Sequence, residues 1–130
     1  MEELEKIENE ISYDIRGAIF RVYNELGPGL LESVYEKALA YELTQMGYDI
    51  EPQVSVPFYY HNIEFDNGFR LDLLVDEKVI IELKSVKTLE DLHHKQLLTY
   101  LKLTGLKLGI LVNFNSSDIS KSIKRVVNNL

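Results

Sequence analysis

Hydrophobic side chains recur at intervals of three and four residues through the first part of the chain. This spacing produces one apolar stripe along a helix, and it predicts an amphipathic helix over residues 4–26. Gly27-Pro28-Gly29 ends that helix, because proline cannot continue it and glycine accepts unusual backbone angles. A second helix follows and ends at Gly47; its apolar residues are Leu31, Val34, Tyr35, Ala38, Leu39 and Leu43.

After residue 50 the hydrophobic period changes to two. The alternation over residues 54–60 predicts a strand, and Pro57 predicts that this strand lies at the edge of a sheet, because proline cannot donate to a central ladder. Asn67-Gly68 is a turn signal, and it predicts the start of a second strand over residues 69–75. Asp76-Glu77-Lys78 then predicts a tight connection to a third strand.

The rest of the chain predicts that third strand and three more elements. They are a strand over residues 79–84, a helix capped by Thr88 that runs to about Leu103, a buried strand over 108–114, and a short helix from Ser117 or Asp118 to about Asn128. The resulting order is ααβββαβα. It predicts a single domain over residues 1–130, an α/β sandwich in which helices flank a mixed sheet of four strands.

Three charged residues, Asp72, Glu82 and Lys84, interrupt the apolar strands. A lone charge in an apolar interior costs several kcal/mol, so such groups persist where they pair, bind a metal or do chemistry. Glu82 and Lys84 project from the same face of their strand, and Asp72 can approach Glu82 across the antiparallel pair. Two close carboxylates repel each other unless a cation lies between them, and oxygen ligands suit Mg²⁺. A metal site is therefore one hypothesis; a Glu82–Lys84 salt bridge and an Asp72 carboxylate paired with Arg70 are the structural alternatives.

Polar residues also occur where the helices should be apolar. His93, Gln96 and Tyr100 fall on the inward stripe of the helix that begins at Thr88. Each can serve the site, and His93 and Tyr100 can equally be packing residues with one hydrogen bond each. Glu32 lies one turn into the second helix, on the face that carries Tyr35 and Glu36; there it could bind a cation or simply stabilise the positive end of the helix.

The composition restricts the functional class. The chain has a net charge of −7, which argues against a generic nucleic-acid coat protein. The charge is uneven: residues 1–65 hold 13 acidic and 4 basic side chains, whereas residues 66–130 hold 8 and 10. Any surface for a polyanion should therefore lie in the second half. The chain has no cysteine, no signal peptide and no apolar run that spans a membrane, so a cytoplasmic protein is expected.

Several motifs together resemble a known family. Asp72 followed by Glu82-Leu83-Lys84 resembles the PD-(D/E)xK nuclease superfamily. Gly29, Glu32 and Tyr35 match the GxxExxY pattern of a family of small proteins within it. Two further matches are an R-x-D strand at Arg70 and Asp72, and an H-x-x-Q-x-x-x-Y helix at His93, Gln96 and Tyr100. The resemblance covers roughly residues 7–128. The proline of the superfamily motif is absent, since Leu71 precedes Asp72; many members of the superfamily also lack this proline.

This resemblance implies a restriction-endonuclease-like fold and a Mg²⁺ or Mn²⁺ site. Its ligands would be Asp72, Glu82, the backbone carbonyl of Leu83 and the helix-borne Glu32. Lys84 would take the place of the catalytic lysine, and Gln96 would support the site; Arg70 would pair with an acidic neighbour or bind phosphate.

The implied activity is hydrolysis of nucleic-acid phosphodiester bonds, with DNA favoured over RNA, and a homodimer is possible because many nucleases of this fold pair to cut two strands. The alternative is a non-catalytic module that binds nucleic acid or protein, or a subunit of a DNA-processing assembly.

Overall fold

Helices and strands follow one another along the chain in nearly the predicted order. The computed structural model describes the backbone of residues 2–130 and the side chains of residues 7–65 and 68–130. The elements are α1 (Glu2–Leu26), α2 (Glu32–Gln45), β1 (Ile50–Tyr60), β2 (Ile63–Val75), β3 (Val79–Lys84), α3 (Asp91–Thr104), β4 (Leu108–Asn113), the short 3₁₀ helix η1 (Ile119–Lys121) and β5 (Ile123–Val127).

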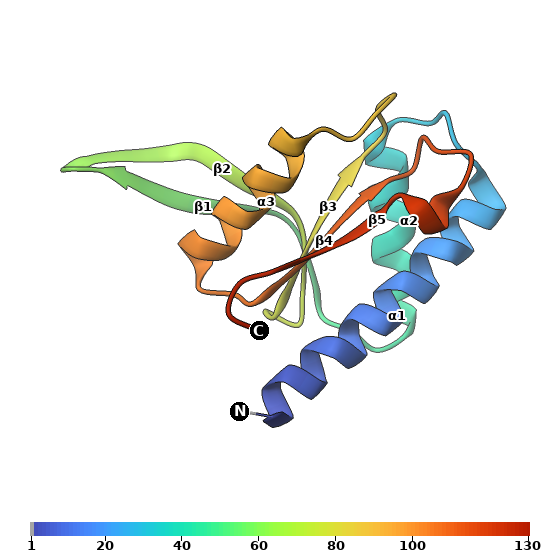
Figure 1. Ribbon diagram of the computed structural model, residues 1–130, viewed down its shortest axis with the longest axis horizontal. Helices are drawn as coiled ribbons and strands as arrows, with labels where there is room; N and C mark the ends of the chain where they lie inside the picture. Colours follow the sequence, from blue (N-terminus) through green and yellow to red (C-terminus); the bar gives the residue numbers. More distant parts are fainter. Residues whose placement is uncertain (1) are drawn as a thin grey trace.

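The strands form one mixed sheet in the order β1-β2-β3-β4-β5. Only β3 and β4 pair in parallel among these strands, because α3 crosses between them; the other neighbours are antiparallel. Figure 1 shows α1 and α2 on one side of the strands and α3 on the other. The α/β sandwich with a mixed sheet, the first two helices and the strand over residues 79–84 are therefore confirmed.

Two apolar cores fill the space between these layers. The larger core joins α1 and α2 to the sheet, with Ile15, Leu39 and Leu73 fully buried. The smaller core joins α3 to the opposite face through Leu97, Leu101 and side chains of the central strands. All six residues of β4 are buried, as expected for a strand covered by helices on both faces.

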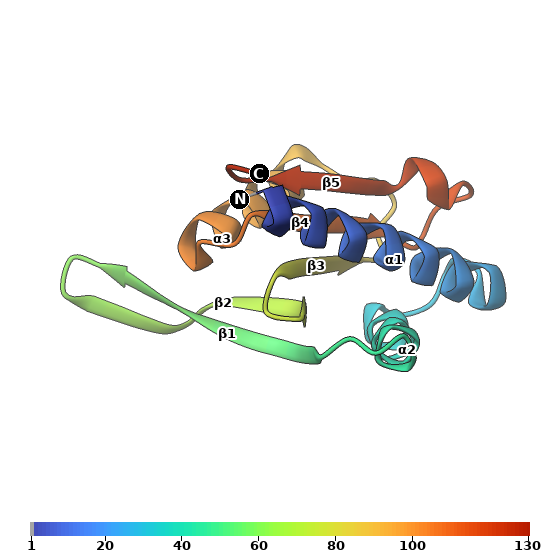
Figure 2. The same ribbon diagram turned by 90° about the horizontal axis from the view of Figure 1, so that it is seen from below.

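The predicted turn at Asn67-Gly68 is wrong. These two residues lie within β2, and the chain reverses instead at residues 61–62, between β1 and β2. The ladder between β1 and β2 changes register between Val56 and Phe58, so residues 66–68 form a bulge opposite Pro57, which has no N–H to donate. Figure 2 shows the resulting hairpin extending well beyond the helices.

The predicted final helix is also wrong, and the sheet has five strands rather than four. Asp118 does cap a helix, but only the short η1, and residues 123–127 then form β5 beside β4. Ile119, Ile123 and Val126 fit a helical spacing. The β-branched residues of this segment also favour a strand, and pairing with the otherwise open edge of β4 decides the outcome.

The N-cap of the third helix lies two residues after the expected cap, Thr88. Glu90 is the N-cap, and His93 closes a capping box with it. Gly105 ends the helix in a left-handed conformation (φ 75°), as its position predicted.

Candidate functional site

Asp72 on β2 and Glu82 on β3 lie opposite each other, as the alternation of the strands predicted. Leu73 pairs with Ile81, and one further step of this register brings the two carboxyl groups together. The Asp72 N–H donates to Glu82 Oε1 at 3.2 Å, and the Leu83 N–H donates to Asp72 Oδ2 at 2.9 Å. Each carboxylate therefore binds the backbone beside the other one, which fixes the position of both.

Burial makes this pair electrostatically costly. Glu82 is only 5% exposed, and its pKa is raised to about 8 by burial first and by the negative charge of Asp72 second. Burial also raises the pKa of Asp72. The interaction between the two carboxyl groups adds to the effect of burial on Glu82, so the pair as a whole holds a proton at a higher pH than two separate carboxyl groups would.

Lys84 is a cation whose charge acts on both carboxylates. It lies two residues beyond Glu82 on the same face of β3 and is partly buried. Its positive charge opposes the effect of burial on both Asp72 and Glu82 and lowers the pKa of each. The structure therefore brings together the three residues that the strand pattern singled out.

Glu32 reaches the site from the first turn of α2. Its Oε2 accepts the N–H of Ser85 at 3.1 Å, and the Ser85 hydroxyl donates to the Leu30 carbonyl at 2.7 Å. These two contacts hold the start of α2 against the end of β3. After burial, which has the largest effect, the charge of Glu32 is among the causes that raise the pKa of Asp72, so the two carboxylates lie within electrostatic reach.

Tyr35 holds the turn that leads into α2. Its side chain is fully buried and stacks on Phe114 with 4.4 Å between ring centroids. Its hydroxyl donates to the Gly27 carbonyl at 2.6 Å and accepts the Leu30 N–H at 3.1 Å. Tyr35 thus acts on the site indirectly, because it fixes the backbone from which Glu32 projects.

Glu36 is an acidic neighbour of the site that was not included in the predicted ligand set. It accepts a hydrogen bond from Gln53 Nε2 at 2.6 Å. Burial raises its pKa, and the charge of Asp72 adds to that effect. The sequence signal was its place four residues after Glu32, since residues at this spacing share one face of a helix.

Gln96 and Tyr100 belong to α3, next to the carboxylates. Gln96 is exposed and donates to the Tyr100 hydroxyl at 3.0 Å. Tyr100 is 4% exposed, and its pKa is raised by burial and by the charges of Glu82 and Asp72. The link between Gln96 and the carboxylates therefore runs through Tyr100.

Two predicted supporting residues, His93 and Arg70, form their hydrogen bonds with groups outside the carboxylate pair. His93 Nδ1 accepts the Glu90 N–H at 3.0 Å and so caps α3. Arg70 is exposed and forms no ion pair with any side chain in residues 7–65 or 68–130, so its expected acidic partner is not found there. Its backbone forms a hydrogen bond with the hydroxyl of Tyr100.

The chemistry of the donor set fits a hard divalent cation. Asp72, Glu82 and Glu32 supply carboxylate oxygens, and a cation between Asp72 and Glu82 would relieve the repulsion between their charges. Among the side chains that the structure describes, no three His, Asp or Glu residues already form a ready-made chelating group. Binding would therefore require side-chain adjustment around the fixed Asp72–Glu82 pair.

Comparison with known proteins gives one family relationship. The family model of the PD-(D/E)XK nuclease superfamily matches residues 9–126. No curated protein matches the chain. Within residues 2–130, none of the helices has the length and apolar character needed to cross a membrane.

Proposed function

The chain belongs to the PD-(D/E)XK nuclease superfamily, and we propose that it is a metal-dependent nuclease that hydrolyses phosphodiester bonds, in DNA rather than RNA. The observation that carries this proposal is the buried Asp72–Glu82 pair with Lys84 on the same face of the sheet. We also assign the chain to the GxxExxY family, because Gly29, Glu32 and Tyr35 build the turn that brings a further carboxylate to the pair.

Nucleases of this superfamily typically use divalent metal ions. In this chain Mg²⁺ or Mn²⁺ would be held by Asp72, Glu82, the carbonyl of Leu83 and Glu32. When bound there, such an ion polarises a phosphoryl oxygen and lowers the pKa of a water molecule.

The side chains around the pair supply the remaining functions. Lys84 places a positive charge next to both carboxylates, where it can orient an attacking water and stabilise negative charge that develops on the phosphoryl group. The burial of Glu82 strengthens these interactions, because charges interact more strongly away from water. Tyr100 packs α3 against β2 through an edge-to-face contact with Phe69, and Gln96 donates a hydrogen bond to the Tyr100 hydroxyl.

A non-catalytic module is the second candidate. Two observations favour it: the net charge of −7, and the use of Asp72 and Glu82 as acceptors for backbone N–H groups, a role that a structural pair can also play. Such a protein would bind nucleic acid or protein in the same region, alone or as a subunit of a DNA-processing assembly, without cleaving a substrate.

Calorimetry and cleavage assays separate these candidates. The wild-type protein should bind Mg²⁺ or Mn²⁺ and cleave at least one form of single-stranded or duplex DNA or RNA. At ten times its dissociation constant, the metal should stabilise the fold by about 1.4 kcal/mol. Lys84→Ala should keep this stabilisation and lose cleavage by about 100-fold or more, whereas Asp72→Asn should lose both.

Absence of both metal binding and cleavage would overturn the nuclease proposal. Oligonucleotide binding without cleavage would then favour the non-catalytic module. Cleavage that survives in Lys84→Ala at the wild-type rate would reveal a contaminating nuclease.

A further inference from the structure

A second polar feature lies between the β3–α3 loop and the β4–β5 loop. It is a pocket of about 340 Å³, lined by ten residues that include three lysines (Lys87, Lys121 and Lys124), two asparagines and four serines or threonines. None of the lining residues is acidic, although the whole chain has a net charge of −7. The pocket therefore concentrates positive charge in an acidic protein.

The two walls of the pocket are held together by a buried amide. Asn113 is 4% exposed; its Oδ1 accepts the N–H groups of Val86 at 3.0 Å and Asn115 at 3.2 Å. Its Nδ2 donates to the Val86 carbonyl at 2.9 Å. Because these bonds join the two loops directly, the pocket has a fixed shape rather than being a chance gap between mobile loops.

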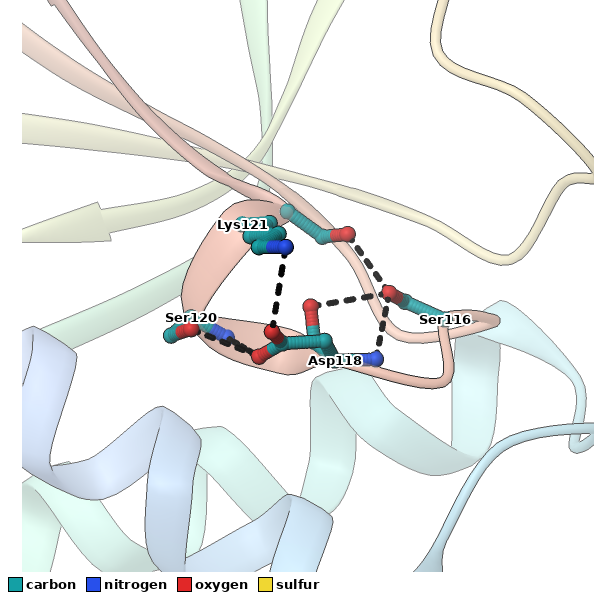
Figure 3. A network of polar contacts seen from close by, with 5 residues as sticks. Ser116, Asp118, Ser120 and Lys121 are labelled. Carbon is teal, nitrogen blue, oxygen red and sulfur yellow. Dashed lines mark hydrogen bonds and ion pairs between the residues drawn. The ribbon is translucent and has the colours of Figure 1, made fainter.

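The second wall is braced by its own hydrogen bonds, which Figure 3 shows. Ser122 donates to Ser116 Oγ at 2.7 Å, and Ser116 Oγ in turn bonds the backbone of Asp118. Lys121 Nζ lies 4.0 Å from Asp118 Oδ2, but their side chains are 85% and 51% exposed. An exposed pair at this distance is weak, so Lys121 remains able to bind another anion.

The register of the sheet connects this pocket to the carboxylate pair. Glu82 pairs with Leu111 and Leu111 pairs with Lys124, so Glu82 and Lys124 project from the same face of the sheet, two strands apart. Two strand spacings are about 10 Å, a distance that phosphate groups of one nucleic-acid strand can span. Lys84 is closer still, because it pairs with Asn113 in the wall of the pocket.

The lining suits the oxygens of a phosphate group. Lysine binds phosphate as a compact positive charge, and hydroxyl and amide groups donate hydrogen bonds to the remaining oxygens. A volume of about 340 Å³ is large enough to hold a phosphate group together with part of its nucleotide.

We propose that this pocket binds a phosphate group of the nucleic-acid strand, a few nucleotides from the bond placed at Asp72, Glu82 and Lys84. The inference rests on the proposed function and adds to it the part of the surface that holds the substrate. An internal phosphodiester and a terminal phosphate offer the same chemistry to the pocket, and the experiment distinguishes between them.

The test compares two double variants of the full chain. Lys87→Gln/Lys124→Gln removes two charges from the pocket. Lys78→Gln/Lys102→Gln is the matched control, because Lys78 lies at the opposite end of β3 and Lys102 in the last turn of α3. Binding of fluorescent oligonucleotides is measured by anisotropy in EDTA at several salt concentrations, so that no cleavage takes place. The probes carry a 5′ phosphate, a 3′ phosphate or neither.

The pocket variant should bind about tenfold or more weakly at low salt. Its plot of log affinity against log salt should be less steep by about 1, since one phosphate contact contributes about 0.7 to 0.9 to the slope. The control should resemble the wild-type protein. An equal loss for all probes indicates an internal phosphodiester, and a loss confined to one phosphorylated probe indicates a terminal phosphate.

Equal affinity of the pocket and control variants would overturn the inference, as would a wild-type protein that binds no probe at low salt. Metal binding and cleavage report separately on the proposed function. If the wild-type protein cleaves nucleic acid and the pocket variant binds it normally, the proposed function stands and the pocket proposal fails. If the wild-type protein does not cleave nucleic acid, but the pocket variant binds it more weakly than the control variant does, the pocket proposal stands and the nuclease proposal fails.

Discussion

Replacement of Glu82 by glutamine should change how the stability of the metal-free protein depends on pH. Burial and the charge of Asp72 raise the pKa of Glu82 from 4.5 to about 8. The folded protein therefore binds a proton that the unfolded chain releases, so the free energy of unfolding falls as the pH rises through this range. One proton corresponds to a slope of about 1.4 kcal/mol per pH unit.

Glutamine is a close substitute for the protonated form of Glu82. Its oxygen can accept the Asp72 N–H and its amide can donate to the Asp72 carboxylate, so Glu82→Gln should lack this slope. At about pH 8.5 the variant should be more stable than the wild-type protein. Between about pH 8 and pH 6 its advantage should shrink by about 1.4 kcal/mol for each pH unit, and each such step corresponds to roughly 5 °C in Tm.

The assay is urea unfolding in EDTA at several pH values, with the two proteins compared at each pH. This comparison removes the contribution of every other titrating group that behaves alike in both. Glu25→Gln, on the exposed side of α1, is the control and should keep the wild-type slope. If the difference between wild type and Glu82→Gln stays constant from about pH 6 to pH 8.5, Glu82 does not hold a proton beside Asp72 and the electrostatic argument fails.

Three further substitutions test how the site is supported. Tyr35→Phe removes the hydroxyl that joins Gly27 to Leu30, so urea unfolding should show a loss of about 1–3 kcal/mol; wild-type stability would contradict the role of this contact. Gly109→Ala would place a Cβ 2.8 Å from Leu97 Cδ1 on α3 and should lower the free energy of unfolding by about 1–3 kcal/mol. In a Leu97→Ala background the same change should cost less, because the clashing side chain is gone; losses that simply add up in the double variant would contradict the clash. Glu36→Gln removes a negative charge near Asp72, so calorimetry should show that Mg²⁺ binds about three- to tenfold more weakly while the fold is unchanged. This loss corresponds to roughly 1 kcal/mol of Coulomb energy. Unaltered affinity would exclude Glu36 from the cation's surroundings.

The central part of the fold was predictable because its sequence signals agree with one another. The strand Val79–Lys84 combines an apolar run with a tight turn before it, and both Asp76 and Glu77 adopt the positive φ values that such a turn requires. This agreement also placed Asp72 opposite Glu82, since a short hairpin fixes both the direction and the register of its strands.

The ends of the sheet were less predictable because tertiary pairing decides them. Asn67-Gly68 carries a strong local turn signal, yet aromatic contacts of Phe58 with Phe65 and Phe69 stabilise pairing on both sides of the bulge. Residues 123–127 likewise satisfy a helical spacing but form a strand, because the edge of β4 offers unpaired backbone groups. Neither the aromatic contacts of Phe58 nor the pairing with the edge of β4 can be identified from the local sequence.

In the candidate site, too, local sequence patterns could place some residues, whereas the positions of others depend on tertiary packing. Asp72, Glu82 and Lys84 could be placed from strand alternation alone, and their catalytic and metal-binding roles remain predictions. His93 could not be separated from a site residue by its helical position, because its role as a cap depends on Glu90 and on the true start of α3. The proximity of Glu36 to Asp72 depends on how α2 packs against the sheet.

The two residues that follow Lys84 connect the carboxylate pair to the basic pocket. Ser85 is bonded to Glu32 and Leu30 at the start of α2, whereas Val86 is bonded through both its N–H and its carbonyl to Asn113. This segment is therefore held from one side by the helix that supplies a carboxylate and from the other by the wall of the pocket that Lys87, Lys121 and Lys124 line. A displacement of either neighbour must be transmitted to Lys84 through a single peptide segment whose backbone donors are already occupied. The fold thus fixes the distance between the proposed reactive centre and the proposed phosphate site by short contacts, and does not rely on a flexible loop to set it.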